Sequence, residues 1–108
     1  MPINNKYNKN VGTPITILTA TTTGAGDLYA LTSNVRQSLA FQAILSVGTA
    51  SVDIEVSLNG VDVCDTPAAT IALSANSDGV TTSAAWGYWR ANVTAIAGGG
   101  TLTVLASN

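Results

Sequence analysis

The sequence predicts an all-β fold, a single β-sandwich of about seven or eight strands, either a jelly roll or an immunoglobulin-like Greek key. Three observations predict it. Short segments alternate apolar and polar residues with a period of two, Thr, Val and Ile dominate these segments, and turn residues separate them regularly. A chain of 108 residues corresponds to one domain. We therefore expect an extended N-terminal arm over residues 1–10, which lack periodicity, and the sandwich over residues 11–108.

The first half of the chain predicts three strands. The segment "TPITILTATTT" predicts a strand that starts near Pro14 and is broken at Gly24–Gly26, and "DLYALT" predicts a short strand after it. The clearest alternation follows, with Ile44 as its exception, and its core-facing residues are Val35, Leu39, Phe41, Ala43, Leu45 and Val47. A helix over residues 33–45 is the competing reading, but the apolar spacing fits a period of two better than 3.6.

The next segment predicts a hairpin. In "SVDIEVSL" the apolar residues that share one face are Val52, Ile54, Val56 and Leu58. Asn59-Gly60 follows and favours a type I′ turn, in which both central residues have positive φ. We expect "VDVCD" to be the return strand, with Val61 and Val63 on one face, and Pro67 to end it.

The remaining strands are predicted by the same pattern. "ATIALSA" reads as a strand closed by the turn "NSDG", "VTTSA" as a short strand, and "TLTVLAS" as the last strand, with Leu102 and Val104 on one face. Between the last two, alternation from Tyr88 onward predicts a strand that the segment "AGGG" ends.

That strand carries a dense aromatic cluster in "AAWGYWRANVTAIAGGG". Its alternation directs Trp89, Ala91, Val93 and Ala95 toward the core, and Tyr88, Arg90, Asn92 and Thr94 outward. Gly87 interrupts the register, so the direction of Trp86 stays open. We expect Trp89 to fill the core and Arg90 to be solvated or paired across strands, while Trp86, Tyr88 and Arg90 are candidate contacts for a protein partner.

Composition argues against several classes of function. Charged residues make up 9% of the chain against roughly 25% in ordinary domains, and the net charge of −2 does not favour nucleic acid. No apolar run is long enough to span a membrane. The polar start is not a secretory signal, so we expect synthesis in the cytoplasm without a signal peptide. The single cysteine, Cys64, has no partner for an intramolecular disulfide, and the chain has no histidine.

Candidate chemical sites are few. Asp53 and Glu55 share a strand face, the kind of carboxylate pair that acts on glycosidic bonds. Asp62, Asp65 and Asp78 carry oxygen ligands suited to calcium, but their spacing matches no motif. Gly98–Gly100 lacks the strand–loop–helix context of a phosphate loop, and no histidine is present to activate Cys64 or a Ser nucleophile. We therefore expect no enzyme activity, no metal and no cofactor.

The C-terminal segment "WGYWRANVTAIAGGGTLTVLASN" resembles the ending of small all-β virion proteins of tailed bacteriophages, with its Trp/Tyr–Arg–Ala–x–Val strand, Gly-rich turn and final strand. The resemblance implies a capsid decoration (cement) protein, located on the virion surface as a homo-oligomer, with a trimer favoured. It also implies that the partner is the major capsid protein, whose subunits the chain bridges and stabilises. The arm, with Lys6, Tyr7 and Lys9, is a further candidate contact. The alternatives are a tail, baseplate or fibre component, and a small carbohydrate- or receptor-binding module.

Overall fold

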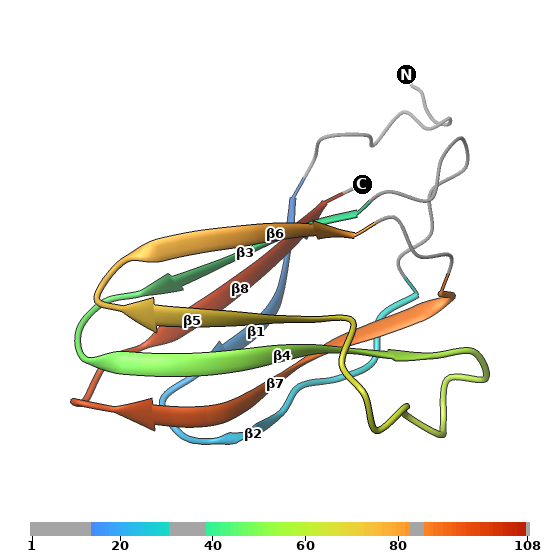
Figure 1. Cartoon of the computed structure of the whole chain (residues 1–108), viewed down its shortest axis with the longest axis horizontal. Coiled ribbons are helices and arrows are strands. Elements are labelled where there is room, and N and C mark those ends of the chain that lie inside the picture. The colour runs from blue at the N-terminus through green and yellow to red at the C-terminus, as the bar shows by residue number, and fades with distance from the viewer. Residues whose placement is uncertain (1–13, 31–38, 83–85, 108) are drawn as a thin grey trace.

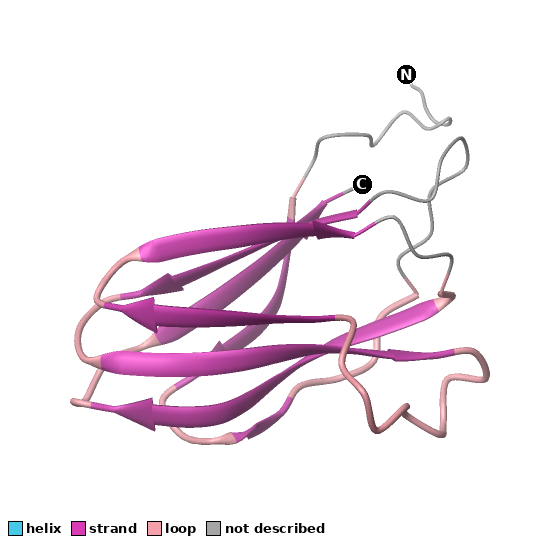
Figure 2. Ribbon diagram, viewed as in Figure 1, coloured by secondary structure: helices cyan, strands magenta, loops and turns pink. Residues whose placement is uncertain are grey.

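A computed structural model describes residues 14–30, 39–82 and 86–107 of the chain. All regular structure within these residues is β, so the prediction of an all-β chain is confirmed (Figure 2). The described strands are β1 (Ile15–Ala20), β2 (Gly24–Ala25), β3 (Leu39–Leu45), β4 (Thr49–Ser57), β5 (Ala69–Ser74), β6 (Ser77–Thr82), β7 (Tyr88–Ala97) and β8 (Leu102–Ser107). No helix in this part of the chain has the length and apolar character needed to cross a membrane. The predicted arm over residues 1–10 lies outside the described residues.

The described strands form two antiparallel sheets of four strands each (Figure 1). The first sheet has the order β1-β8-β3-β6 and the second the order β2-β7-β4-β5. Four pairings are nested around the β4–β5 connection: β4 with β5, β3 with β6, β2 with β7 and β1 with β8. The pairings of β3 with β8 and of β4 with β7 complete the two sheets. The first described strand is therefore hydrogen-bonded to the last.

One hydrophobic core lies between the two sheets, because alternation turns one side of each strand inward. In β3, Leu39, Phe41, Ala43 and Leu45 are buried, while Ala40, Gln42 and Ile44 are exposed. The ring of Phe41 in the first sheet contacts the fully buried Trp89 of the second, with ring centroids 5.3 Å apart and planes tilted by 39°. An aromatic side chain buries roughly 150–250 Å², so this pair is a large part of the contact between the sheets.

The connections between strands differ at the two ends of the molecule. Residues 21–23, 46–48, 75–76 and 98–101 form short turns at one end, on the left in Figure 1. At the opposite end the described connections are longer, with residues 26–30 after β2 and residues 58–68 between β4 and β5. Described parts of this second end include the loop between β4 and β5, which we call the 58–68 loop.

Glycines allow two of the short turns to contact each other closely. The β3–β4 turn and the β7–β8 turn each cross from one sheet to the other, and Thr101 N donates to Ser46 Oγ at 2.9 Å between them. A Cβ built on Gly48 would lie 2.0 Å from the carbonyl oxygen of Ala97, and one on Gly100 would lie 2.0 Å from that of Val47. No side chain fits at either position unless a backbone moves.

The predicted hairpin at Asn59-Gly60 is wrong. Gly60 has φ 76°, but Asn59 is not in the positive-φ region, so the type I′ turn is absent. The segment "VDVCD" lies in the 58–68 loop, where Val61 is exposed, and β5 is the strand that returns along β4. The parity of β4 ends with the strand, which leaves Leu58 70% exposed.

Three other boundaries differ from the predictions. The turn after β5 is at residues 75–76, with Ala75 at φ 48°, and the rest of "NSDG" belongs to β6. Gly24–Ala25, predicted as a break, is a short strand because it pairs with β7. The described part of "DLYALT" contributes only an isolated bridge between Tyr29 and Trp89.

One shift of register explains the outer half of β7. Ser51 pairs with Ala95 and Val52 with Val93, so Thr94 is an extra residue and forms a β-bulge. The bulge reverses the parity beyond it, which exposes Ala95, predicted as a core residue, and packs Ile96 against the core. Val47, also predicted to face inward, is exposed because it lies in the β3–β4 turn.

Candidate partner-binding face

The candidate face is the outer side of β7 and β4 in the second sheet. Strand β7 alternates as predicted up to the bulge, so Trp89, Ala91 and Val93 are buried between the sheets. The outward residues Tyr88, Arg90 and Asn92, here called the outer row, are half-buried. The prediction that Trp89 fills the core is confirmed by its full burial.

Arg90 is paired across strands with Glu55. Sheet register sets these residues opposite each other, and Arg90 Nε lies 2.7 Å from Glu55 Oε1. Asn92 Nδ2 donates to the second oxygen, Glu55 Oε2, at 2.9 Å. Only 11% of the Glu55 side chain and 27% of the Arg90 side chain are exposed, so solvent screens this pair less than a surface pair. The carboxylate is neutralised and both of its oxygens have partners.

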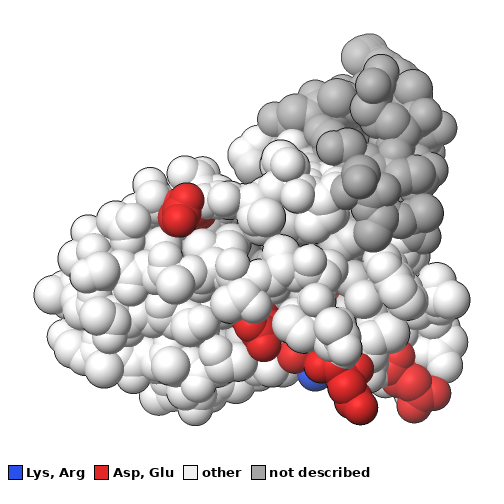
Figure 3. Space-filling model, viewed as in Figure 1, with Lys and Arg blue, Asp and Glu red and all other residues white. Residues whose placement is uncertain are grey.

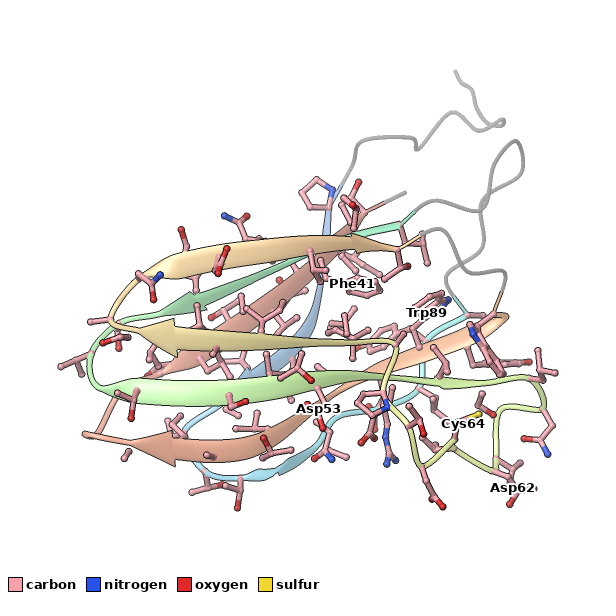
Figure 4. The ribbon with its side chains drawn as sticks, viewed as in Figure 1. Phe41, Asp53, Asp62, Cys64 and Trp89 are labelled. Atoms are coloured by element: carbon pink, nitrogen blue, oxygen red, sulfur yellow. The ribbon has the colours of Figure 1, made fainter. Side chains whose placement is uncertain are left out.

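Tyr88 packs over the 58–68 loop and does not project freely from the sheet. A Cβ on Gly60 would lie 3.1 Å from two ring carbons of Tyr88, which shows how closely the ring covers this glycine. The loop returns to β4 through two backbone bonds, from Cys64 N to Val56 O at 2.9 Å and from Ala68 N to Ile54 O at 2.8 Å. Figure 4 shows Cys64 and Asp62 on this loop, beside the end of β4.

Trp86, whose direction the sequence left open, packs against the core from the side. Its carbonyl oxygen accepts a hydrogen bond from Trp89 Nε1 at 2.9 Å, so the buried indole nitrogen is satisfied. Tyr29 packs there too and exchanges backbone hydrogen bonds with Trp89 in both directions. Every aromatic side chain among the described residues is thus buried or half-buried.

The carboxylates that the sequence offers for catalysis or metal binding lie in different environments in the structure. Asp53 Oδ1 accepts a hydrogen bond from Thr70 Oγ1 at 2.7 Å, and Glu55 is paired as described above. Asp62 and Asp65 lie in the 58–68 loop, whereas Asp78 belongs to β6 in the other sheet. Across the described ranges, no three His, Cys, Asp or Glu residues gather closely enough to hold a metal ion.

Charge is unevenly distributed over the molecule. In Figure 3 the acidic residues gather mainly along the lower centre and lower right of the view, with one further acidic group at the upper left. All six carboxylates of the chain lie in the described residues, where Arg90 is the single cation. Both lysines belong to the predicted arm, so Lys6, Tyr7 and Lys9 lie outside the residues that the structure describes.

The structure adds Glu55 to this face, a residue that sequence reasoning did not place beside the outer row. Sequence position makes Glu55 a candidate for catalysis and Asn92 an outward residue, and in the structure both Arg90 and Asn92 donate hydrogen bonds to the Glu55 carboxylate. Arg90 and Asn92 are 35 and 37 residues from Glu55 along the chain, so no local sequence pattern indicates these contacts. The one available signal was that Glu55 and Arg90 are opposite charges on outward positions of two strands.

Comparison of this chain with protein-family models, with curated proteins and with solved structures finds no match.

Proposed function

We propose that this chain is a structural virion protein with a jelly-roll β-sandwich fold, which binds the outer surface of a tailed-phage capsid and bridges major capsid protein subunits. The nested strand pairing carries the proposal. Pairing of β1 with β8, β2 with β7, β3 with β6 and β4 with β5 is what results when one long hairpin wraps into two sheets. Eight-stranded jelly rolls of two sheets recur in viral capsid proteins.

The same pairing argues against the immunoglobulin-like alternative. In that fold the first strand lies at the edge of a sheet beside the second strand. Here β1 lies beside β8, and β1 and β2 belong to different sheets. This arrangement of β1 and β2 supports the jelly-roll part of the proposal.

The distribution of loops supports a contact surface at one end of this sandwich. Short turns joined through Gly48 and Gly100 make one end rigid, while the longer connections lie at the other. Binding residues of rigid β scaffolds are concentrated on such loops. The start of β7 with Tyr88, and the 58–68 loop with exposed Leu58 and Val61, lie at the long-loop end.

Charge supports assembly through the N-terminal arm. The arm brings Lys6 and Lys9 and no carboxylate, whereas the described sheets and loops bring six carboxylates and one arginine. We propose that the arm extends to an adjacent subunit, either the major capsid protein or another copy within a homotrimer. Many weak contacts repeated by symmetry then give high avidity without a single strong site.

A carbohydrate-binding module is the less favoured candidate. Sugar rings stack on exposed aromatic platforms, but Phe41 and Trp89 are buried, and Tyr29, Trp86 and Tyr88 are half-buried. A tail, baseplate or fibre component would use the same architecture, so its location on the particle is what separates it from a capsid protein.

Co-sedimentation with purified particles tests the proposal. The chain should sediment with intact capsids in a fixed copy ratio to the major capsid protein, and behave as a trimer by light scattering. The variant Lys6→Gln/Lys9→Gln should bind more weakly, since each lost cation removes a salt-sensitive contact. The matched variant Asn4→Gln/Asn8→Gln keeps the charge and should bind as the unmodified chain does. Sedimentation with isolated tails only, or with neither part, would overturn the capsid assignment.

A further inference from the structure

The 58–68 loop contains the one Asn-Gly pair in the sequence, Asn59-Gly60. Asn followed by Gly is the dipeptide most prone to spontaneous deamidation, because glycine has no side chain to hinder its own nitrogen. The Gly60 nitrogen can then attack Cγ of the Asn59 amide. Since this pair does not form the expected hairpin, its role in the loop requires another explanation.

Asn59 organises the loop through four hydrogen bonds of its exposed side chain. Its Oδ1 accepts from Ser57 Oγ at 3.1 Å, from Val61 N at 2.9 Å and from Asp62 N at 2.8 Å. Its Nδ2 donates to Asp62 Oδ2 at 3.0 Å. Gly60 N donates to Ser57 Oγ at 3.1 Å, and Ser57 is fully buried. Both reacting groups are thus engaged with other partners.

This arrangement opposes the reaction. To attack Cγ, the Gly60 nitrogen must turn away from Ser57 Oγ, and the Asn59 amide must rotate away from the Val61 and Asp62 nitrogens. The three donors on Oδ1 polarise the amide, but the rotation breaks these bonds before they can stabilise the developing charge. The reaction therefore requires the loop to open first, as in other local unfolding events.

We propose that Asn59 is a deamidation site whose rate is set by opening of the 58–68 loop, and that deamidation prevents the loop from closing again. In the open loop, a bond forms between Gly60 N and Asn59 Cγ, and the nitrogen releases its proton to solvent. The bond from Cγ to Nδ2 breaks, and Nδ2 takes up a proton and leaves as ammonia. Water then opens the cyclic imide at either carbonyl, giving aspartate or isoaspartate at position 59.

The product cannot restore the closed loop. A carboxylate at position 59 has no Nδ2–H to donate. It would lie next to the Asp62 carboxylate, to which the Asn59 amide donates a hydrogen bond of 3.0 Å in the closed loop. Two like charges at this separation repel each other, and isoaspartate also lengthens the backbone by one carbon. The loop that displays Leu58 and Val61, which are 70% and 76% exposed, is then altered irreversibly. The fraction of molecules deamidated at Asn59 would therefore increase with the age of the protein, whatever its function.

Peptide mapping by mass spectrometry tests the first half of the proposal. The full chain is incubated folded, and in parallel in urea, at mildly alkaline pH, and the conversion of Asn59 is followed with Asn76, which precedes Ser77, as internal reference. We expect conversion of Asn59 to be at least about tenfold slower in the folded chain than in urea. Equal rates in the two states, or no conversion in either, would overturn the proposal.

Two variants of the same loop separate the hydrogen bond from a general charge effect. Asp62→Ala removes the acceptor of Asn59 Nδ2 and should speed conversion in the folded chain about fivefold, the factor expected for one hydrogen bond. Asp65→Ala removes an equally exposed carboxylate of the loop and should leave the rate unchanged. Equal acceleration by both variants, or by neither, would contradict gating through Asp62.

The variant Asn59→Asp tests the second half. Hydrogen exchange of the Val61 and Asp62 amides, which bind Asn59 Oδ1 in the closed loop, should become faster in this variant. Exchange in the paired strands β3 and β8 should not change, which shows that the effect is local. Unchanged exchange at Val61 and Asp62 would show that the loop tolerates the product, and the claim of irreversibility would be wrong.

Discussion

Substitution of the glycines at the β3–β4 and β7–β8 turns gives a sharp test of the packing described above. Gly99 and Gly100 in the β7–β8 turn, and Gly87 before β7, differ in the restriction on a side chain, so alanine substitutions separate two kinds of cost. Gly99 has φ 79° and nothing within 4 Å of a built Cβ. Gly100 is buried and has no positive φ, but its Cβ would lie 2.0 Å from the carbonyl oxygen of Val47. Gly87 has neither restriction and is the control.

The expected magnitudes follow from these geometries. Gly99→Ala places a side chain in the left-handed region, which costs about 1 kcal/mol of unfolding free energy. For Gly100→Ala, contacts of Cβ under 3.0 Å essentially never occur, so one backbone must move by about 1 Å. Overpacking costs about 1–3 kcal/mol, and we expect about 3 because the contact is with a backbone carbonyl that no rotamer change can move. Gly87→Ala should change stability by less than about 0.5 kcal/mol.

Urea unfolding followed by the fluorescence of the buried Trp89 measures the three variants. Thermal unfolding should give the same order, with the midpoint of Gly100→Ala lowered by at least about 12 °C. The reasoning is refuted if Gly100→Ala is as stable as Gly87→Ala, or if Gly99→Ala is the most destabilised. In the first case the two turns would not be in contact, and in the second the backbone conformation would outweigh their packing.

Two further substitutions test the second sheet. Arg90→Leu should lower the unfolding free energy by about 2 kcal/mol, because it leaves the largely buried Glu55 carboxylate without its cation. The double variant Arg90→Leu/Glu55→Leu should recover most of that loss. Urea unfolding measures both variants, and equal stability of the single and the double variant would contradict the expectation. Trp89→Phe should lower the unfolding free energy by about 2–3 kcal/mol, since it leaves a cavity and an unpaired Trp86 carbonyl. In a Trp86→Phe variant, the fluorescence of the remaining Trp89 should be shielded from acrylamide. Strong quenching in that variant would mean that Trp89 is not in the core.

Much of the fold could be predicted where one strand face is buried. The alternation from Leu39 to Leu45 and at Leu102 and Val104 agrees with the burial of these residues. A half-buried strand needs apolar residues at every second position, and this period is visible in the sequence. Gly24–Ala25 could not be predicted, since a two-residue strand is defined by its hydrogen bonds to β7 and has no side-chain pattern.

The errors at Thr94 and Asn59-Gly60 share a physical cause. A β-bulge changes which residues face inward without changing the composition. The sequence around Thr94 therefore does not indicate that the inward and outward positions exchange there. Asn-Gly favours a tight turn, but the side chain of Asn59 can equally satisfy backbone nitrogens within a longer loop, and Ser57 and Asp62 make that alternative possible. The pairing of Glu55 with Arg90 depends on which strands are neighbours, which periodicity does not determine.

The position of β8 has a consequence for how this chain folds. β8 lies between β1 and β3, so the first sheet lacks an inner strand until residues 102–107 have been synthesised and released from the ribosome. Until then β1 has no neighbour in that sheet, and its backbone donors and acceptors are open to other chains. Pairing β1 with β8 closes a long stretch of chain, which is slow, so we expect the chain to be vulnerable to aggregation until β8 is in place.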